Sequence, residues 1–399
     1  MQSHLKPPEI TAVLCALIRG DLDPEEWARF SPSVWPDILR RAEIEGVAPL
    51  IWHTAERAPL PDLDPILLQD LAQGYYRAAG RSALQLKELG RILQGLEKAD
   101  LRALILKGAA LALSIYPDPA LRPMGDLDFL VPRDSLEPAL RTLADLGYEK
   151  TERPVTSSLD PVIEREFFLL GGPAQNVGVD LHWNLIAGDA DWRTPPLEWF
   201  WSQTTPLPYP LEAHPENGFF HRQLSPTASL LYASAHTMLQ HGGSARLIWK
   251  VDIQRLLSVY ERQIDWEELL RQARALRWDA ALAAALAWTE ENLGASVPEG
   301  AIAALSREAD PHSVRVVDDL NQTGRSRTRR RIGQLATLNW KARLGVAARL
   351  IFPPPAYLKL AYRPHPAWVW PLYYPYRWGD IVKDTLSSAL TQFAFRKAK

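Results

Sequence analysis

The 399-residue sequence has a single cysteine, Cys15, and no run of about 18 consecutive apolar residues. One cysteine excludes an internal disulfide framework and a zinc site built on cysteines, and it suits a reducing cytosol. The missing apolar run excludes a transmembrane helix. The first ten residues, MQSHLKPPEI, lack the basic-then-apolar pattern of a signal peptide. We therefore expect a cytoplasmic globular protein without membrane insertion.

Net charge is also low, at −2, which excludes a protein that binds polyanions over its whole surface. The charge is unevenly distributed, however. Residues 325–399 contain fifteen Lys or Arg residues and two acidic ones, a net charge of +13, so the first 324 residues carry −15. Such a basic region can contact phosphate, an acidic partner or the acidic body of the same chain. Its aromatic- and proline-rich stretch, residues 352–380, should pack over the body as a strap, because proline interrupts each candidate helix.

Hydrophobic periodicity predicts an α+β fold. Apolar spacing indicates N-terminal helices over residues 10–18, 24–30, 34–45 and 65–96. Short apolar runs at 101–107 and 125–132, a strand at 147–152 and a hairpin from 164–170 and 177–185 predict a small mixed sheet. Helices follow over 225–241, 246–260, 266–276, 279–293 and about 332–352. We expect an N-terminal helical region (1–98), an α/β core (99–190), a helical domain (191–320) and the basic C-terminal region (321–399).

Three aspartates are the main candidates for chemistry. Asp126 and Asp128 are two residues apart on a predicted strand and so project from one face, and Asp180 shares a face of another strand with His182. Neighbouring strands would gather the three carboxylates, which repel one another unless hard cations lie between them. All-oxygen ligation suits Mg²⁺ or Mn²⁺. Two such ions can hold the attacking and leaving oxygens of a phosphoryl transfer.

Four cationic side chains are candidate phosphate contacts. Arg122 precedes Asp126 by four residues in a loop, where it could bind phosphate oxygens or pair with an aspartate. Lys107 could contact phosphate or be a solvated charge at a strand end. Arg246 and Lys250 are i,i+4 neighbours on a predicted helix and could form a phosphate clamp.

The remaining polar candidates have structural alternatives. Asp252 could tether Arg246 and Lys250 or lie at the seam between domains. His182 could orient Asp180 or a nucleotide, or be a structural residue of the sheet. His236 and His241 are five residues apart on a predicted helix, so they should not share a face as i,i+4 zinc ligands would, and we expect no histidine metal site.

The motifs LKGAAL (106–111), RPMGDLDFLVP (122–132), VDLHW (179–183) and RLIWKVDI (246–253), with the histidine-containing helix between the last two, resemble one known family. The sequence is similar to the polymerase-β-like nucleotidyltransferases, and specifically to a bacterial family of uncharacterised nucleotidyltransferases, over about residues 30–300. The resemblance implies a nucleotidyltransferase core in which Asp126, Asp128 and Asp180 hold the metal. Gly108 would open the helix after the first strand. Ala109 stands where the superfamily usually has serine or glycine, so Lys107 would replace the serine contact to phosphate.

The resemblance implies Mg²⁺-dependent transfer of an NMP group from an NTP to a hydroxyl or phosphate of a small molecule or peptide, with release of diphosphate. Lys107, Gly108, Arg122, Arg246 and Lys250 would contact the nucleotide. Two alternatives remain: a glycosyltransferase whose D-x-D motif holds a metal-bound nucleotide sugar, and a non-catalytic nucleotide-binding module. DNA is not expected as a partner, because no helix-hairpin-helix glycine pattern occurs.

Overall fold

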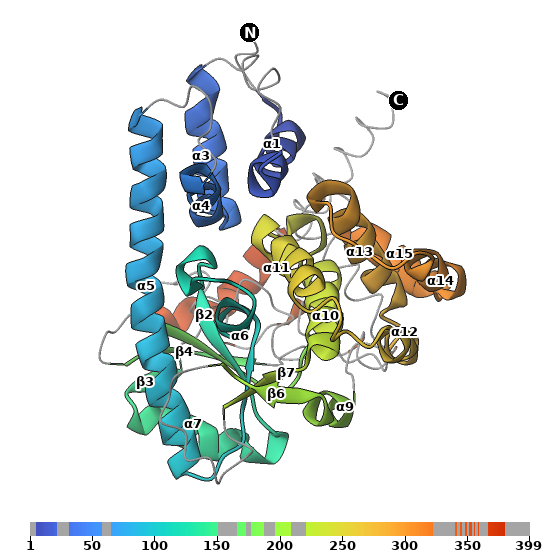
Figure 1. Ribbon diagram of the computed structural model, residues 1–399. Coiled ribbons are helices and arrows are strands. Elements are labelled where there is room, and N and C mark those ends of the chain that lie inside the picture. Colours follow the sequence, from blue (N-terminus) through green and yellow to red (C-terminus); the bar gives the residue numbers. More distant parts are fainter. Residues whose placement is uncertain are drawn as a thin grey trace.

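The computed structural model of the chain describes residues 5–21, 32–57, 65–150, 166–172, 177–186, 196–208, 221–321 and 366–379, together with positions 340, 344, 348, 351, 352, 355 and 358. The helix expected over residues 24–30, the hairpin turn at 173–176 and most of the region 321–399 lie outside the described residues. Figure 1 shows a central sheet with helices on both sides. The predicted α+β fold is confirmed.

The N-terminal region is helical, with α1 (Pro7–Arg19), α3 (Trp35–Glu45), α4 (Ala48–Arg57) and α5 (Pro65–Lys98). The sequence analysis did not predict α4, which has Pro49 in its first turn, where the missing N–H costs no helical hydrogen bond. α5 has 34 residues and so is about 51 Å long. It runs along one side of the molecule, from α3 and α4 down to α7 beside the sheet (Figure 1).

The sheet has the strand order β3-β4-β5-β2-β1-β7-β6 among the described residues. Its strands are β1 (Leu104–Leu106), β2 (Asp126–Leu130), β3 (Tyr148–Lys150), β4 (Glu166–Gly171), β5 (Val177–His182), β6 (Thr204–Pro206) and β7 (Arg222–Leu224). β4 and β5 form the predicted antiparallel hairpin, and β2 pairs in parallel with β5. β6 and β7 were not predicted, because three-residue strands are too short to show alternation.

The two faces of the sheet pack on different helices. Leu127 and Phe129 of β2 lie on the face covered by α5 and α7 (Leu136–Asp145). Leu130 and the β1 residues Leu104 and Leu106 belong to the opposite face, which packs on the helical part of the chain. α6 (Lys107–Ser114) follows β1 directly. This alternation places the aspartates of β2 and β5 on the face toward the helical part.

The helical part comprises α9 (Leu197–Ser202), α10 (Pro226–Ala235), a π-helical turn (His236–His241), α11 (Leu247–Val259), α12 (Trp266–Ala275), α13 (Asp279–Leu293), α14 (Ala301–Glu308) and α15 (Pro311–Asn321). Ser225 caps α10 by accepting a hydrogen bond from the N–H of Ala228. α1 packs against α13, and Arg19 donates a hydrogen bond to the carbonyl oxygen of Asn292. The N-terminal helices and the helical part therefore share one hydrophobic core.

The described residues of the stretch expected as a strap differ in burial. Leu358 and Arg377 are buried, whereas Trp368 and Leu372 are 75% and 72% exposed. Residues 340, 344, 348 and 351 are helical, within the predicted helix at 332–352. Within the described part of the chain, no helix has the length and apolar character needed to cross a membrane.

Candidate active site

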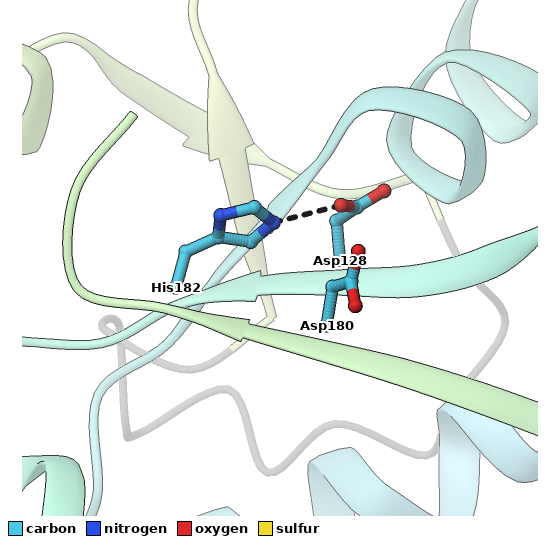
Figure 2. A group of neighbouring side chains, drawn as sticks. All are labelled: Asp128, Asp180 and His182. Atoms are coloured by element: carbon cyan, nitrogen blue, oxygen red, sulfur yellow. Dashed lines mark hydrogen bonds and ion pairs between the residues drawn. The ribbon is translucent and has the colours of Figure 1, made fainter. Parts of the chain in front are cut away.

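Two aspartates and a histidine meet where β2 and β5 pair. In the parallel register, Asp128 is opposite Asp180 and Leu130 is opposite His182, so these polar side chains lie on one face. Asp128, Asp180 and His182 are all buried, and each offers a potential ligand atom within 4.8 Å of the others. Figure 2 shows the two carboxylates side by side, with the imidazole directed at Asp128.

His182 holds one oxygen of Asp128. The Nε2 atom of His182 lies 2.8 Å from Oδ1 of Asp128. An ionised carboxylate can only accept, so Nε2 carries the proton and has no lone pair for a metal while this bond exists. The Oδ2 atom of Asp128 receives no hydrogen bond from any part of the chain that the structure describes. Oδ2 of Asp128 and the carboxylate of Asp180 are oxygen donors of the kind that fit a divalent cation.

Lys107 supplies a positive charge to the same group. Its Nζ lies 2.7 Å from Oδ1 of Asp128 and 3.4 Å from Nε2 of His182. Burial by itself raises the pKa of Asp128, but the Lys107 ammonium and the hydrogen bond from His182 outweigh burial and hold that pKa below its usual range. Lys107 has a positive φ of 45°, which is uncommon for a residue with a Cβ and is typical of functional sites.

Asp126 lies at the start of β2. It shares the strand face of Asp128 but is opposite Gly178 and is only partly buried. It is not a member of the close group formed by Asp128, Asp180 and His182. The sequence analysis gave His182 no ligand or hydrogen-bond role toward Asp128. The signal was present in the D-x-H spacing of Asp180 and His182, which puts both on one strand face.

Arg122 forms a buried ion pair with an aspartate from the helical part. Its Nη2 and Nε donate to Oδ2 and Oδ1 of Asp252 on α11 at 2.6 and 3.2 Å. Tyr116 donates a third hydrogen bond to Asp252, at 2.8 Å. Asp252 thus joins α11 to the loop before β2 through Arg122, which fits the expected place at the seam between domains and not a tether of Arg246 and Lys250. Gly108 makes room for this pair, because a Cβ there would lie 2.9 Å from Nη1 of Arg122.

A family model described as uncharacterised nucleotidyltransferase matches residues 31–294 of the chain. The chain belongs to this family of nucleotidyltransferases. The matched range extends from α3 to α13 and includes every strand of the described sheet. The family expected from the sequence motifs is therefore confirmed. No curated protein and no solved structure matches the chain.

In this nucleotidyltransferase, Arg246 at the N-cap of α11 and Lys250 within α11 contact different groups. Arg246 donates from Nε to the carbonyl oxygen of Ile44. Burial lowers the pKa of Arg246, the charge of Arg122 lowers it further, and Glu45 and Asp126 act in the opposite direction. The Lys250 ammonium instead lies 3.8 Å from the ring centroid of Trp288 on α13. The Arg246 guanidinium thus contacts the backbone at Ile44 and Lys250 contacts Trp288, so the two cations do not converge as the expected i,i+4 clamp.

A cavity of about 30 Å³ adjoins the nucleotidyltransferase site between the sheet and the helical part. Its lining includes Lys107 and Arg122 from the sheet side and Tyr232, Thr237 and Trp249 from the helices. Such a volume has room for one or two water molecules. The buried Oγ1 of Thr237 has no hydrogen-bond partner among the described residues. The helical part therefore contributes a polar atom next to the charged site.

The prediction that His236 and His241 lie on different faces of their helix was wrong. Their ring centroids are 4.7 Å apart, and both rings contact Trp249. The cause is the π-helical turn His236–His241, in which the hydrogen bonds join residues five apart. Gly242 ends this turn with a φ of 50°, and a Cβ there would lie 2.2 Å from the carbonyl oxygen of Leu320. His236 and Trp249 line the cavity, and the ring of His241 contacts both of them.

Proposed function

We propose that this nucleotidyltransferase moves an NMP group from an NTP to a hydroxyl or phosphate of a small-molecule or peptide acceptor and releases diphosphate. The observation that carries the proposal is the in-register pair of buried aspartates, Asp128 and Asp180, beside the ammonium of Lys107. Two anions this close favour a bound cation. The family supports nucleotidyl transfer, and the acceptor class is our proposal.

The aspartates form the cation site in this proposal. Asp128 and Asp180, with Asp126 at the partly exposed end of β2, hold Mg²⁺ or Mn²⁺, and His182 fixes the orientation of Asp128. The bound cation would neutralise phosphate charge and acidify the acceptor hydroxyl. Asp180 then needs to be only a weak base toward the proton of that hydroxyl.

The cationic side chains bind the triphosphate in this proposal. Lys107, Arg122 and Arg246 supply positive charge around the β2 end, and Arg246 has no ion pair with any described carboxylate. The acceptor oxygen forms a bond to the α-phosphorus while the bond from that phosphorus to the bridging oxygen breaks, and diphosphate leaves. Positioning and charge neutralisation account for such a step without covalent protein chemistry.

Label transfer tests the proposal. An NTP labelled in the α-phosphate is incubated with the enzyme, Mg²⁺ or Mn²⁺ and cell extract, and we expect label on an acceptor with stoichiometric diphosphate. Asp180→Asn should abolish transfer and leave NTP binding largely intact, because it removes a charge but keeps the shape. Asp145→Asn, on the exposed surface of α7, is the matched control. Transfer of a sugar from a nucleotide sugar would instead establish a glycosyltransferase, and the absence of any nucleotide binding would contradict the proposal.

The two cations of α11 provide a second test. Arg246→Gln should weaken NTP binding by roughly tenfold, because a charge-assisted hydrogen bond contributes about 1.5–3 kcal/mol. Lys250→Gln should leave NTP binding unchanged, because the ammonium faces Trp288. Calorimetric titration with a non-hydrolysable NTP measures both. Equal losses in the two variants would contradict the assignment of Arg246 to the phosphates.

A further inference from the structure

The C-terminal region presents large apolar side chains to solvent. We call the aromatic face the six residues Trp340, Leu344, Phe352, Trp368, Leu372 and Tyr376, each of which is at least 60% exposed. Water-exposed side chains of this size in one region are unusual for a soluble surface, and they mark an interaction site. Residues 366–379 of this region are drawn in red in Figure 1.

The aromatic face consists of two groups of residues. Trp340 and Leu344 are helical positions four residues apart, and Phe352 follows the helical residue Ile351. Trp368 and Leu372 belong to the 3-10 helix Ala367–Leu372, and Tyr376 lies in the helical residues 373–379 that follow it. Phe352 contacts the rings of Tyr374 and Trp378, at centroid distances of 5.9 and 5.8 Å. The indole N–H of Trp378 donates to the carbonyl oxygen of Ile351 at 2.8 Å. These contacts join Phe352 to the segment that contains Trp368, Leu372 and Tyr376.

We propose that the aromatic face docks this enzyme on the surface of an anionic lipid membrane. Tryptophan and tyrosine are the residues enriched where proteins meet the headgroup layer of a membrane. The region 325–399 has a net charge of +13, and the rest of the chain has −15. An anionic surface attracts the first and repels the second, and all six side chains of the aromatic face belong to the region that is attracted. With no membrane-crossing helix in the described part of the chain, the contact is at the surface, as for an interfacial amphipathic segment.

Two other occupants fit the observations less well. Single-stranded nucleic acid also binds basic, aromatic surfaces, but it does so by stacking on rings, whereas Leu344 and Leu372 are aliphatic. A stable protein interface is depleted of charged residues at its centre, whereas fifteen Lys or Arg residues occur in this region. Aliphatic side chains among aromatic rings and positive charge fit a lipid surface best.

Vesicle flotation of the full-length protein tests this proposal without nucleotide, so its outcome is independent of the transfer reaction. We expect binding to vesicles of phosphatidylcholine with about 30% phosphatidylglycerol, weaker binding to phosphatidylcholine alone, and loss of binding at high salt. Trp368→Ser combined with Leu372→Ser should weaken binding by roughly tenfold or more. The matched control combines Ile66→Ser and Tyr76→Ser on α5, where both side chains are 66% exposed.

Near-ultraviolet circular dichroism checks that both double variants remain folded. Equal vesicle binding by the Trp368/Leu372 variant and the wild type would overturn the proposal. An absence of binding to anionic vesicles would also overturn it. Binding of a single-stranded oligonucleotide would then indicate nucleic acid as the occupant, and a dimer in gel filtration that the same variant disrupts would indicate a second copy of the chain.

Discussion

Replacing Asp252 by alanine should lower the free energy of unfolding by about 3–5 kcal/mol, the usual cost of breaking a buried ion pair from one side. The side chains of Arg122 and Asp252 are only 6% and 3% exposed, so water cannot replace the lost carboxylate. The substitution removes the two hydrogen bonds that Asp252 accepts from Arg122 and the one that it accepts from Tyr116. It therefore leaves a desolvated guanidinium and a buried phenol hydroxyl without their acceptor.

Urea denaturation followed by tryptophan fluorescence measures this loss. The control is Glu43→Ala, which breaks an ion pair with Arg77 whose side chains are 57% and 63% exposed. That change should cost less than about 1 kcal/mol. The double variant Arg122→Met with Asp252→Leu should recover much of the lost stability, because it removes both buried charges. An Asp252→Ala variant as stable as the Glu43→Ala control would refute the reasoning.

Three further predictions concern the small residues Gly108, Gly80 and Cys15. Gly108→Ala should destabilise the protein by about 1–3 kcal/mol, because the new Cβ would lie 2.9 Å from Nη1 of Arg122. Gly80→Ala, on α5 with nothing within 4 Å of the new Cβ, should instead stabilise it by about 0.5–1 kcal/mol; thermal unfolding distinguishes the two signs. Burial raises the pKa of the Cys15 thiol to about 11, so a thiol reagent at pH 8 should modify it only after denaturation, and rapid labelling of the native protein would show that the thiol is accessible.

The parts of the fold that follow hydrophobic periodicity could be predicted from the sequence. β2 alternates Leu127 and Phe129 with its aspartates, and the helix expected over 279–293 has those bounds in the structure. The elements that were missed have weak local signals. Pro49 in the first turn of α4 resembles a helix breaker. β7 depends on pairing with β1, which is distant in sequence, and β6 pairs only with β7 among the described strands.

For the candidate site, the sequence predicts only which side chains share a face of one strand. Alternation placed Asp180 and His182 on one face, but which acid His182 would contact depends on the register between β2 and β5. Lys250 and Arg246 are neighbours in helical spacing, yet the ammonium of Lys250 contacts Trp288, which the sequence places 38 residues later. Contacts between elements of this kind have no local sequence signal.

The contact between α1 and α13 has a consequence for the synthesis of the chain. Arg19 and its partner Asn292 are 273 residues apart, and at about 5–20 residues per second a ribosome needs roughly 15–50 s to add that length. Through this interval the apolar side of α1, which includes Leu14 and Leu17, can pack on α3 and α4 but lacks α13. The N-terminal helices therefore emerge long before their partners and have to be kept from aggregating, and slowing translation upstream of α13 should lower the yield of native enzyme.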